Sequence, residues 1–307
     1  MRDRLAYTES SPDAFSNAGD ANHTPMTSTF LRDAMIERLG QARTDQNPGP
    51  FPRDGLVRNL HGDFTPMMCG GISALLLQML HPLALAGIWD HSRFREDMIG
   101  RLRRTSDFIA TTSFGTFEQA ETAIARVRRV HEYVKGHATD GRPYAADDPD
   151  LLVWVHVAEM SRFMAGHLRY RNPQMSHADQ DRYFFETACI AEALGARNVP
   201  DSRAAVEEYL ARTRPELICD ARTREVIQVL LDAPPRNLVL RPAGALFMQA
   251  GIDLLPDWAS EMLGLNMSRL KRQAVRTGIK SAMPMISKAV RSGAYRRALE
   301  RLQSAKK

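Results

Sequence analysis

The clearest pattern of apolar and polar positions lies in residues 116–136. Apolar residues recur there at alternating steps of three and four, which is the spacing of one face of an α-helix. Thr116 and Gln119 fit a capping box at the start of this helix, and Gly136 is typical of a helix end. The predicted face consists of Phe117, Ala120, Ile124, Val127, His131 and Val134. The pattern therefore places one histidine on an otherwise apolar helix face.

The preceding stretch, residues 94–112, has the same helical spacing and carries Arg101 on its apolar side. Arg101, Arg104 and Thr105 occupy positions i, i+3 and i+4 of this predicted helix. A guanidinium directed towards a core is costly unless it meets an anion or hydrogen-bond acceptors. Two readings stay open from the residues alone: an internal cofactor, or a core histidine bonded to a carbonyl beside an arginine whose head reaches solvent.

Helices are also predicted for most of the remaining chain, because capping residues, glycines and prolines bound stretches of helical length. The expected ranges are 29–43, 72–88 with a break at Pro82, 176–194, 202–214, 220–231, 242–254 and a C-terminal stretch interrupted near Pro284. No stretch alternates with period two clearly enough to predict a strand. The predicted fold class is therefore all-α, with one multi-helix domain over residues 26–307 and a disordered tail over residues 1–25.

A further helix is expected to begin after Asp148, which suits a cap, with Pro149 in the first turn. Its apolar side includes His156, which points inward or nearly so. A hydrogen-bonded core histidine explains this position as well as a role in a cofactor pocket does. His81 and His91 leave the same choice open, and we do not assign them as ligands.

Several short motifs, taken together in order and spacing, resemble one known family. They are Gly70-Gly71 with the run Ala74-Leu75-Leu76-Leu77-Gln78, His81-Pro82, Asp90-His91-Ser92, Arg101-x-x-Arg104-Thr105, Phe114-Gly115-Thr116, His131 and Leu152-x-Trp154-Val155-His156. This set is similar to the haem oxygenases that include the latex clearing protein and the MpaB oxygenase of mycophenolic acid biosynthesis. The resemblance implies an all-helical fold that encloses one b-type haem and uses dioxygen to cleave carbon–carbon double bonds in isoprenoid chains.

The resemblance also implies roles for single residues. His131 matches the proximal iron ligand of the family, and Arg101 and Thr105 match its Arg and Thr beside the haem. Arg104 stands where the rubber-cleaving member has a lysine. A guanidinium has no lone pair for iron, so we expect an open distal position with Arg104 and Thr105 as hydrogen-bond donors. Arg101 is then an anchor for a propionate or for the fold. His156 is a further candidate for contact with the haem.

The expected function is that of a haem-b-dependent oxidoreductase or oxygenase that uses dioxygen on a lipophilic, alkene-bearing, isoprenoid-like small molecule. Two alternatives remain at this point: a haem-dependent dehydrogenase or peroxidase-like tailoring enzyme, and a non-catalytic haem-binding or interaction protein whose basic tail binds a membrane or nucleic acid. Other chemistries lack their motifs, because no Glu-x-x-His pair, H-E-x-x-H, G-x-S-x-G, Walker or Rossmann pattern is present.

Charge is unevenly distributed along the chain. The formal net charge is +5, yet residues 266–307 contain twelve Lys or Arg residues and one acidic residue, Glu300. This basic extension predicts helices that contact an anionic membrane surface, while a merely solvated face remains the plain alternative. Nucleic acid is not an expected partner, and the sequence does not indicate an oligomeric state.

The location follows from three observations on composition. Cys69, Cys189 and Cys219 are far apart and form no C-x-x-C motif, which suits a reducing compartment. The N-terminal residues lack the apolar region of a secretion signal. Residues 72–88 are strongly apolar, but Gln78, His81 and Pro82 favour a broken core helix over a membrane span. We therefore expect a cytoplasmic protein with peripheral membrane contact.

Overall fold

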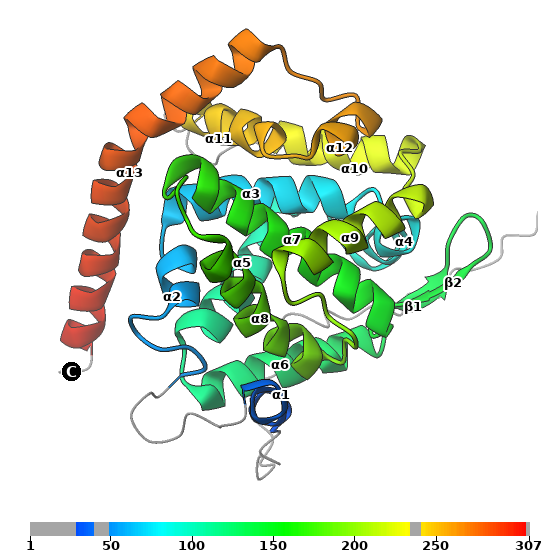
Figure 1. Ribbon diagram of the computed structural model, residues 1–307, viewed down its shortest axis with the longest axis horizontal. Helices are drawn as coiled ribbons and strands as arrows, with labels where there is room; N and C mark the ends of the chain where they lie inside the picture. The colour runs from blue at the N-terminus through cyan, green and yellow to red at the C-terminus, as the bar shows by residue number, and fades with distance from the viewer. Residues whose placement is uncertain (1–28, 40–48, 234–240, 305–307) are drawn as a thin grey trace, which may run out of the picture.

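Two helices at the centre of the fold, α3 (Phe64–Gln78) and α7 (Pro149–Tyr170), make its most extensive helix–helix contact. Figure 1 shows the computed structural model, which describes residues 29–39, 49–233 and 241–304. Within these ranges the chain forms thirteen α-helices, one short 3-10 helix and one two-stranded hairpin. The all-α fold class is therefore confirmed. The predicted disordered tail, residues 1–25, lies outside the described residues.

Close packing of α3 against α7 depends on two glycines. A Cβ atom at Gly70 would lie 2.7 Å from the backbone oxygen of Arg162, and one at Gly166 would lie 2.5 Å from the backbone oxygen of Pro66. A real side chain does not fit at these distances, so the two backbones approach as closely as glycine permits. Trp154 of α7 is fully buried and donates from Nε1 to the backbone oxygen of Gln78 at 3.3 Å.

The apolar stretch after residue 72 is broken as the sequence predicts. α3 ends at Gln78, and α4 (Pro82–His91) begins with Pro82 and leaves at an angle of 100° to α3. Among the described helices none alone is long and apolar enough to cross a membrane, and only this bent pair passes that test by length and composition.

The two amphipathic helices that the sequence predicts over residues 94–112 and 116–136 are α5 (Met98–Phe114) and α6 (Phe117–His131). The capping box of α6 is confirmed, because Gln119 Oε1 accepts from Thr116 N at 2.9 Å and Thr116 Oγ1 accepts from Gln119 N at 3.2 Å. The predicted end at Gly136 is wrong. The helix ends five residues earlier, at His131.

Gly136 instead lies in a hairpin that the sequence did not reveal. Strand β1 (Lys135–His137) pairs with β2 (Pro143–Ala145), and Gly136 faces Tyr144. A Cβ atom at Gly136 would lie 2.7 Å from Tyr144 Oη, so this glycine makes room for an aromatic ring and does not cap a helix. Each strand has only three residues, which is too short for a period-two pattern to be recognised.

The other helices surround this centre, and most follow the expected ranges. They are α1 (Phe30–Leu39), α2 (Leu56–His61), α8 (His177–Leu194), α9 (Arg203–Thr213), η1 (Arg214–Glu216), α10 (Ala221–Asp232), α11 (Arg241–Asp253), α12 (Asp257–Met262) and α13 (Arg269–Ser304). α8 ends at Leu194 and is capped by Gly195, whose φ of 114° favours glycine. The predicted interruption near Pro284 is wrong, because α13 continues through it and only changes direction along its length (Figure 1).

Candidate functional site

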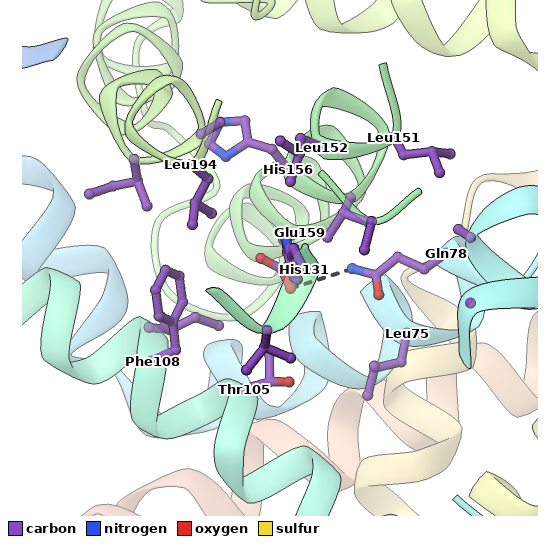
Figure 2. A pocket seen from close by; sticks show the side chains of 18 of the residues that line it. Leu75, Gln78, Thr105, Phe108, His131, Leu151, Leu152, His156, Glu159 and Leu194 are labelled. Atoms are coloured by element: carbon purple, nitrogen blue, oxygen red, sulfur yellow. Dashed lines mark hydrogen bonds between the residues drawn. The ribbon is translucent and has the colours of Figure 1, made fainter. Parts of the chain in front are cut away.

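A cavity of about 360 Å³ lies between α3 and α7 and the neighbouring helices α4, α5, α6 and α8. Most of its wall is apolar, with Leu75 from α3, Phe108 from α5, Leu152 from α7 and Leu194 from α8 (Figure 2). α4 and the β1–β2 hairpin close the remaining side, where Tyr144 also contributes. Polar side chains enter this wall at a few positions, and four of the five sequence-predicted site residues are among them.

His131, the last residue of α6, lines the cavity as predicted. Burial lowers the pKa of its imidazole, and the nearby Asp147 carboxylate opposes this only in part. The ring is therefore neutral near pH 7, which is the form that binds a metal. Its Nδ1 atom is buried and has no hydrogen-bond partner among the described residues.

The three predicted residues of α5 are divided between two environments. Arg101 and Thr105 line the cavity, whereas Arg104 does not. The Arg104 side chain is 51% exposed and forms an ion pair with Asp97 at 3.4 Å. Asp97 caps α5 by accepting from Gly100 N, so its carboxylate lies outside the cavity and holds Arg104 there. Arg104 is therefore in no position to donate to a ligand in the cavity, which corrects the distal role expected for it.

Arg101 is largely buried, and its guanidinium has no close partner among the described residues. Burial, followed by repulsion from Arg104, lowers the pKa of its guanidinium to about 10, while Glu159 opposes the shift. In the part of the chain that the structure describes, its side chain forms no hydrogen bond and no ion pair within 4 Å. A buried guanidinium with free donors favours an anionic group of a ligand as its partner.

Two further histidines also face the cavity. His156 of α7 lies in the wall as predicted (Figure 2), and burial, followed by repulsion from Arg38, lowers its pKa to about 3. His61 of α2 was not identified from the sequence, because α2 has only six residues and shows no periodic pattern. Its Nδ1 lies 2.7 Å from Ser113 Oγ and its Nε2 lies 2.8 Å from Tyr183 Oη.

His81 and His91, to which the sequence analysis assigned no role, lie in different surroundings. His81 caps α4, where its Nδ1 accepts from Ala84 N at 3.4 Å, and it does not line the cavity. His91 does line the cavity, and its Nε2 lies 3.3 Å from the backbone oxygen of Lys135. Both therefore have local structural partners.

Glu159 is the functional candidate that the sequence analysis missed. It lies one turn after His156 on α7 and faces the same cavity (Figure 2). Gln78 Nε2 donates to its Oε1 at 3.4 Å, which is a long hydrogen bond. Burial raises the pKa of this carboxyl to about 7. An available signal was a single acidic residue within the long apolar run that starts at Leu151.

The residues of the cavity fit a haem better than a bare metal ion. A bare ion needs several protein ligands, and no three His, Cys, Asp or Glu side chains gather into such a site among the described residues. Iron held by a porphyrin needs only one or two protein ligands. His131, with its orphaned nitrogen, suits that role, apolar walls suit the ring, and Arg101 suits a propionate.

Comparison with known proteins gives one match. The family model described as ER-bound oxygenase mpaB/B'/Rubber oxygenase, catalytic domain, matches residues 58–303, which is well over half of the chain. The matched region contains the whole cavity except Phe51. Neither a curated protein nor a solved structure matches the chain.

Proposed function

The chain belongs to the family of the mpaB and rubber oxygenase catalytic domain, and on that premise we propose that it is a haem-b-dependent oxygenase of lipophilic, alkene-bearing molecules. The family assignment supports oxygenase activity. The observation that carries the haem proposal is the apolar cavity with a neutral His131 in its wall, whose Nδ1 has no hydrogen-bond partner among the described residues. Haem bound there would supply the iron that activates dioxygen.

Three features of the protein support this use of the cavity. His131 would bind the iron through an unprotonated nitrogen, which burial favours by penalising the imidazolium. Arg101 would neutralise a propionate, since its guanidinium has no other close partner among the described residues. Thr105 shares the cavity-facing side of α5 with Arg101 and offers a hydroxyl there, although its Oγ1 donates to the backbone oxygen of Arg101 at 3.4 Å.

The apolar wall supports a lipophilic substrate. Leucine, isoleucine and phenylalanine side chains exclude water and offer an isoprenoid chain the burial of its hydrocarbon surface. Exclusion of water also protects reactive species formed during oxygen chemistry from side reactions. An isoprenoid-like alkene therefore suits the cavity better than a polar metabolite does.

Oxygen uptake by the haem-loaded protein tests this function. A panel of isoprenoid alkenes and their saturated counterparts is offered, and products are identified by mass spectrometry. We expect oxygen consumption with alkenes only and incorporation of oxygen atoms from labelled dioxygen into the product. Turnover without incorporation would favour the dehydrogenase or peroxidase-like alternative, and haem binding without any turnover would favour a non-catalytic haem protein.

The basic helix α13 supports a second proposal, peripheral contact with an anionic membrane by a cytoplasmic enzyme. α13 runs along one side of the molecule (Figure 1), and a shallow groove beside it is lined by Arg169, Arg276 and Lys280. Lipophilic substrates collect in membranes, so such contact would raise their local supply. In liposome flotation we expect binding to vesicles that contain phosphatidylserine. Equal flotation with neutral vesicles would contradict a role for these charges.

A further inference from the structure

The carboxyl of Glu159 is a buried group with unused hydrogen-bonding capacity. Its side chain is largely buried and lines the cavity. A carboxylate has four lone-pair sites, and the only hydrogen bond it accepts from a described residue is the 3.4 Å bond from Gln78. Buried polar groups in proteins are nearly always hydrogen-bonded, because an unsatisfied one is costly.

The neighbours of Glu159 do not remove this cost. Arg101 interacts with it through charge, yet no ion pair within 4 Å joins them in the described structure. The other groups of the wall close to Glu159 in sequence are His156, which is neutral, and apolar side chains such as Val155 and Met160. The carboxyl is therefore held in place by Gln78 but is left with free acceptor sites towards the cavity.

We propose that Glu159 and Gln78 form a subsite that binds a hydroxyl group of the substrate, so that the molecule oxidised here is an unsaturated lipophilic alcohol and not a pure hydrocarbon. The inference rests on the proposed function only in taking the cavity as the place where the substrate binds. The apolar wall would hold the hydrocarbon chain, and the Glu159 carboxyl would accept the hydroxyl hydrogen.

Charge and hydrogen-bond polarity favour a hydroxyl over other polar groups. An ammonium group on the ligand would share the cavity with the Arg101 guanidinium, and a carboxylate would be repelled by Glu159 when that group is ionised. The ionised Glu159 carboxylate only accepts hydrogen bonds, and it accepts one from Gln78. Ethers and ketones also only accept, so they offer this carboxylate no donor. A hydroxyl group donates, is uncharged and fits a mainly apolar molecule.

The test compares two probes that differ only in the donor. Farnesol and its methyl ether share the same chain and double bonds, but only the alcohol donates a hydrogen bond. Binding of each probe to the protein as purified, with its haem, is measured by calorimetry at about pH 8.5, where the Glu159 carboxyl is ionised and only accepts hydrogen bonds. We expect the alcohol to bind about 10- to 100-fold more tightly than the ether, as befits a hydrogen bond to a carboxylate.

Three variants test whether the preference for the alcohol over its methyl ether depends on Glu159. Glu159→Leu should abolish it, and Glu159→Gln, which keeps one acceptor oxygen in the same shape, should retain part of it. Ile190→Val, a change in the apolar wall on α8, should leave the ratio of the two affinities unchanged. If Glu159→Leu does not fold, the reduced preference in Glu159→Gln decides the question.

The proposal is overturned if wild-type protein binds the two probes equally, if it binds neither, or if Glu159→Gln keeps the full preference. Equal binding together with oxygen consumption would leave the proposed oxygenase intact and remove only the subsite. An alcohol preference that depends on Glu159, without any oxygen consumption, would support the subsite while contradicting the oxygenase.

Discussion

The helices α7 and α13 carry polar side chains in opposite ways. On α7, which is mostly buried, burial lowers the pKa of His156 to about 3 and raises that of Glu159 to about 7. On α13, a hydrogen-bonded ion pair with the buried Asp253 raises the pKa of Arg276. A polar group costs free energy in the first setting and little in the second. The buried polar residues of α7 are therefore candidates for a functional role, while the basic residues of α13 form part of the protein surface.

Burial by itself does not mark a functional residue, as a third side chain of α7 shows. Arg162 is as deeply buried as Glu159, and burial lowers its pKa to about 10. Its Nη1, however, donates to the backbone oxygen of Leu254 at 2.6 Å, so it fastens α7 to the end of α11. Glu159 differs because its spare hydrogen-bonding sites face a cavity.

The largest predicted effect concerns the charge of Glu159. Because its pKa is raised from 4.5 to about 7, the folded protein keeps a proton that the unfolded chain releases at lower pH. Its contribution to the free energy of unfolding is full below pH 4.5 and is lost as pH rises through about 7, by at most about 3 kcal/mol. Chemical denaturation of wild type and Glu159→Gln at several pH values measures the difference.

Buried histidines affect the same titration with the opposite sign. The pKa values of His61 and His156 are lowered to about 3 by burial, so these residues destabilise the fold as pH falls below 6.5. Both are present in wild type and in Glu159→Gln, and their effect cancels in the comparison. A difference between the two proteins that does not change with pH would contradict the assignment for Glu159.

The next effect concerns the glycines that allow α7 to be buried. Gly70→Ala should lower the free energy of unfolding by about 1 to 3 kcal/mol, since its Cβ would lie 2.7 Å from a backbone oxygen of α7. Gly71→Ala is the matched control, because a Cβ there meets only Phe163 at 3.8 Å. Its stability should be unchanged or slightly raised. Equal losses in both variants by thermal denaturation would contradict the account of the helix crossing.

A smaller effect separates the two arginines of α5. Arg101→Gln should weaken haem retention by about tenfold, because it removes the guanidinium inside the cavity. Arg104→Gln removes a side chain that pairs with Asp97 outside the cavity and should leave retention unchanged. Haem transfer to apomyoglobin measures both rates of loss. The reverse order would show that Arg104, and not Arg101, faces the bound haem.

The smallest effect on stability is expected on α13. Lys271 and Lys280 are exposed, so replacing both by alanine should change the free energy of unfolding by less than about 0.5 kcal/mol. The same variant should float less with vesicles that contain phosphatidylserine. A large loss of stability in this double variant would contradict the conclusion that polar residues on α13 contribute little to the free energy of unfolding.

The sequence predicted the features that depend on local periodicity and end signals. The capping box of α6, the position of His131 on the inward side of that helix and the all-helical composition follow from spacing and residue type. The environments of Arg104 and Gly136 could not be predicted, because each depends on a partner, Asp97 or Tyr144, whose position is set by the folded structure. Glu159 was missed because periodicity shows which side of a helix faces inward but not where the interior remains hollow.

The most direct test of the central claim is the absorption spectrum of the protein as purified from cells supplied with a haem precursor. We expect a Soret band and close to one haem per chain in the wild type, and loss of both in a His131→Ala variant that retains the helical circular dichroism of wild type. Wild-type protein without a Soret band, or a folded His131→Ala variant with the same spectrum and haem content, would contradict it.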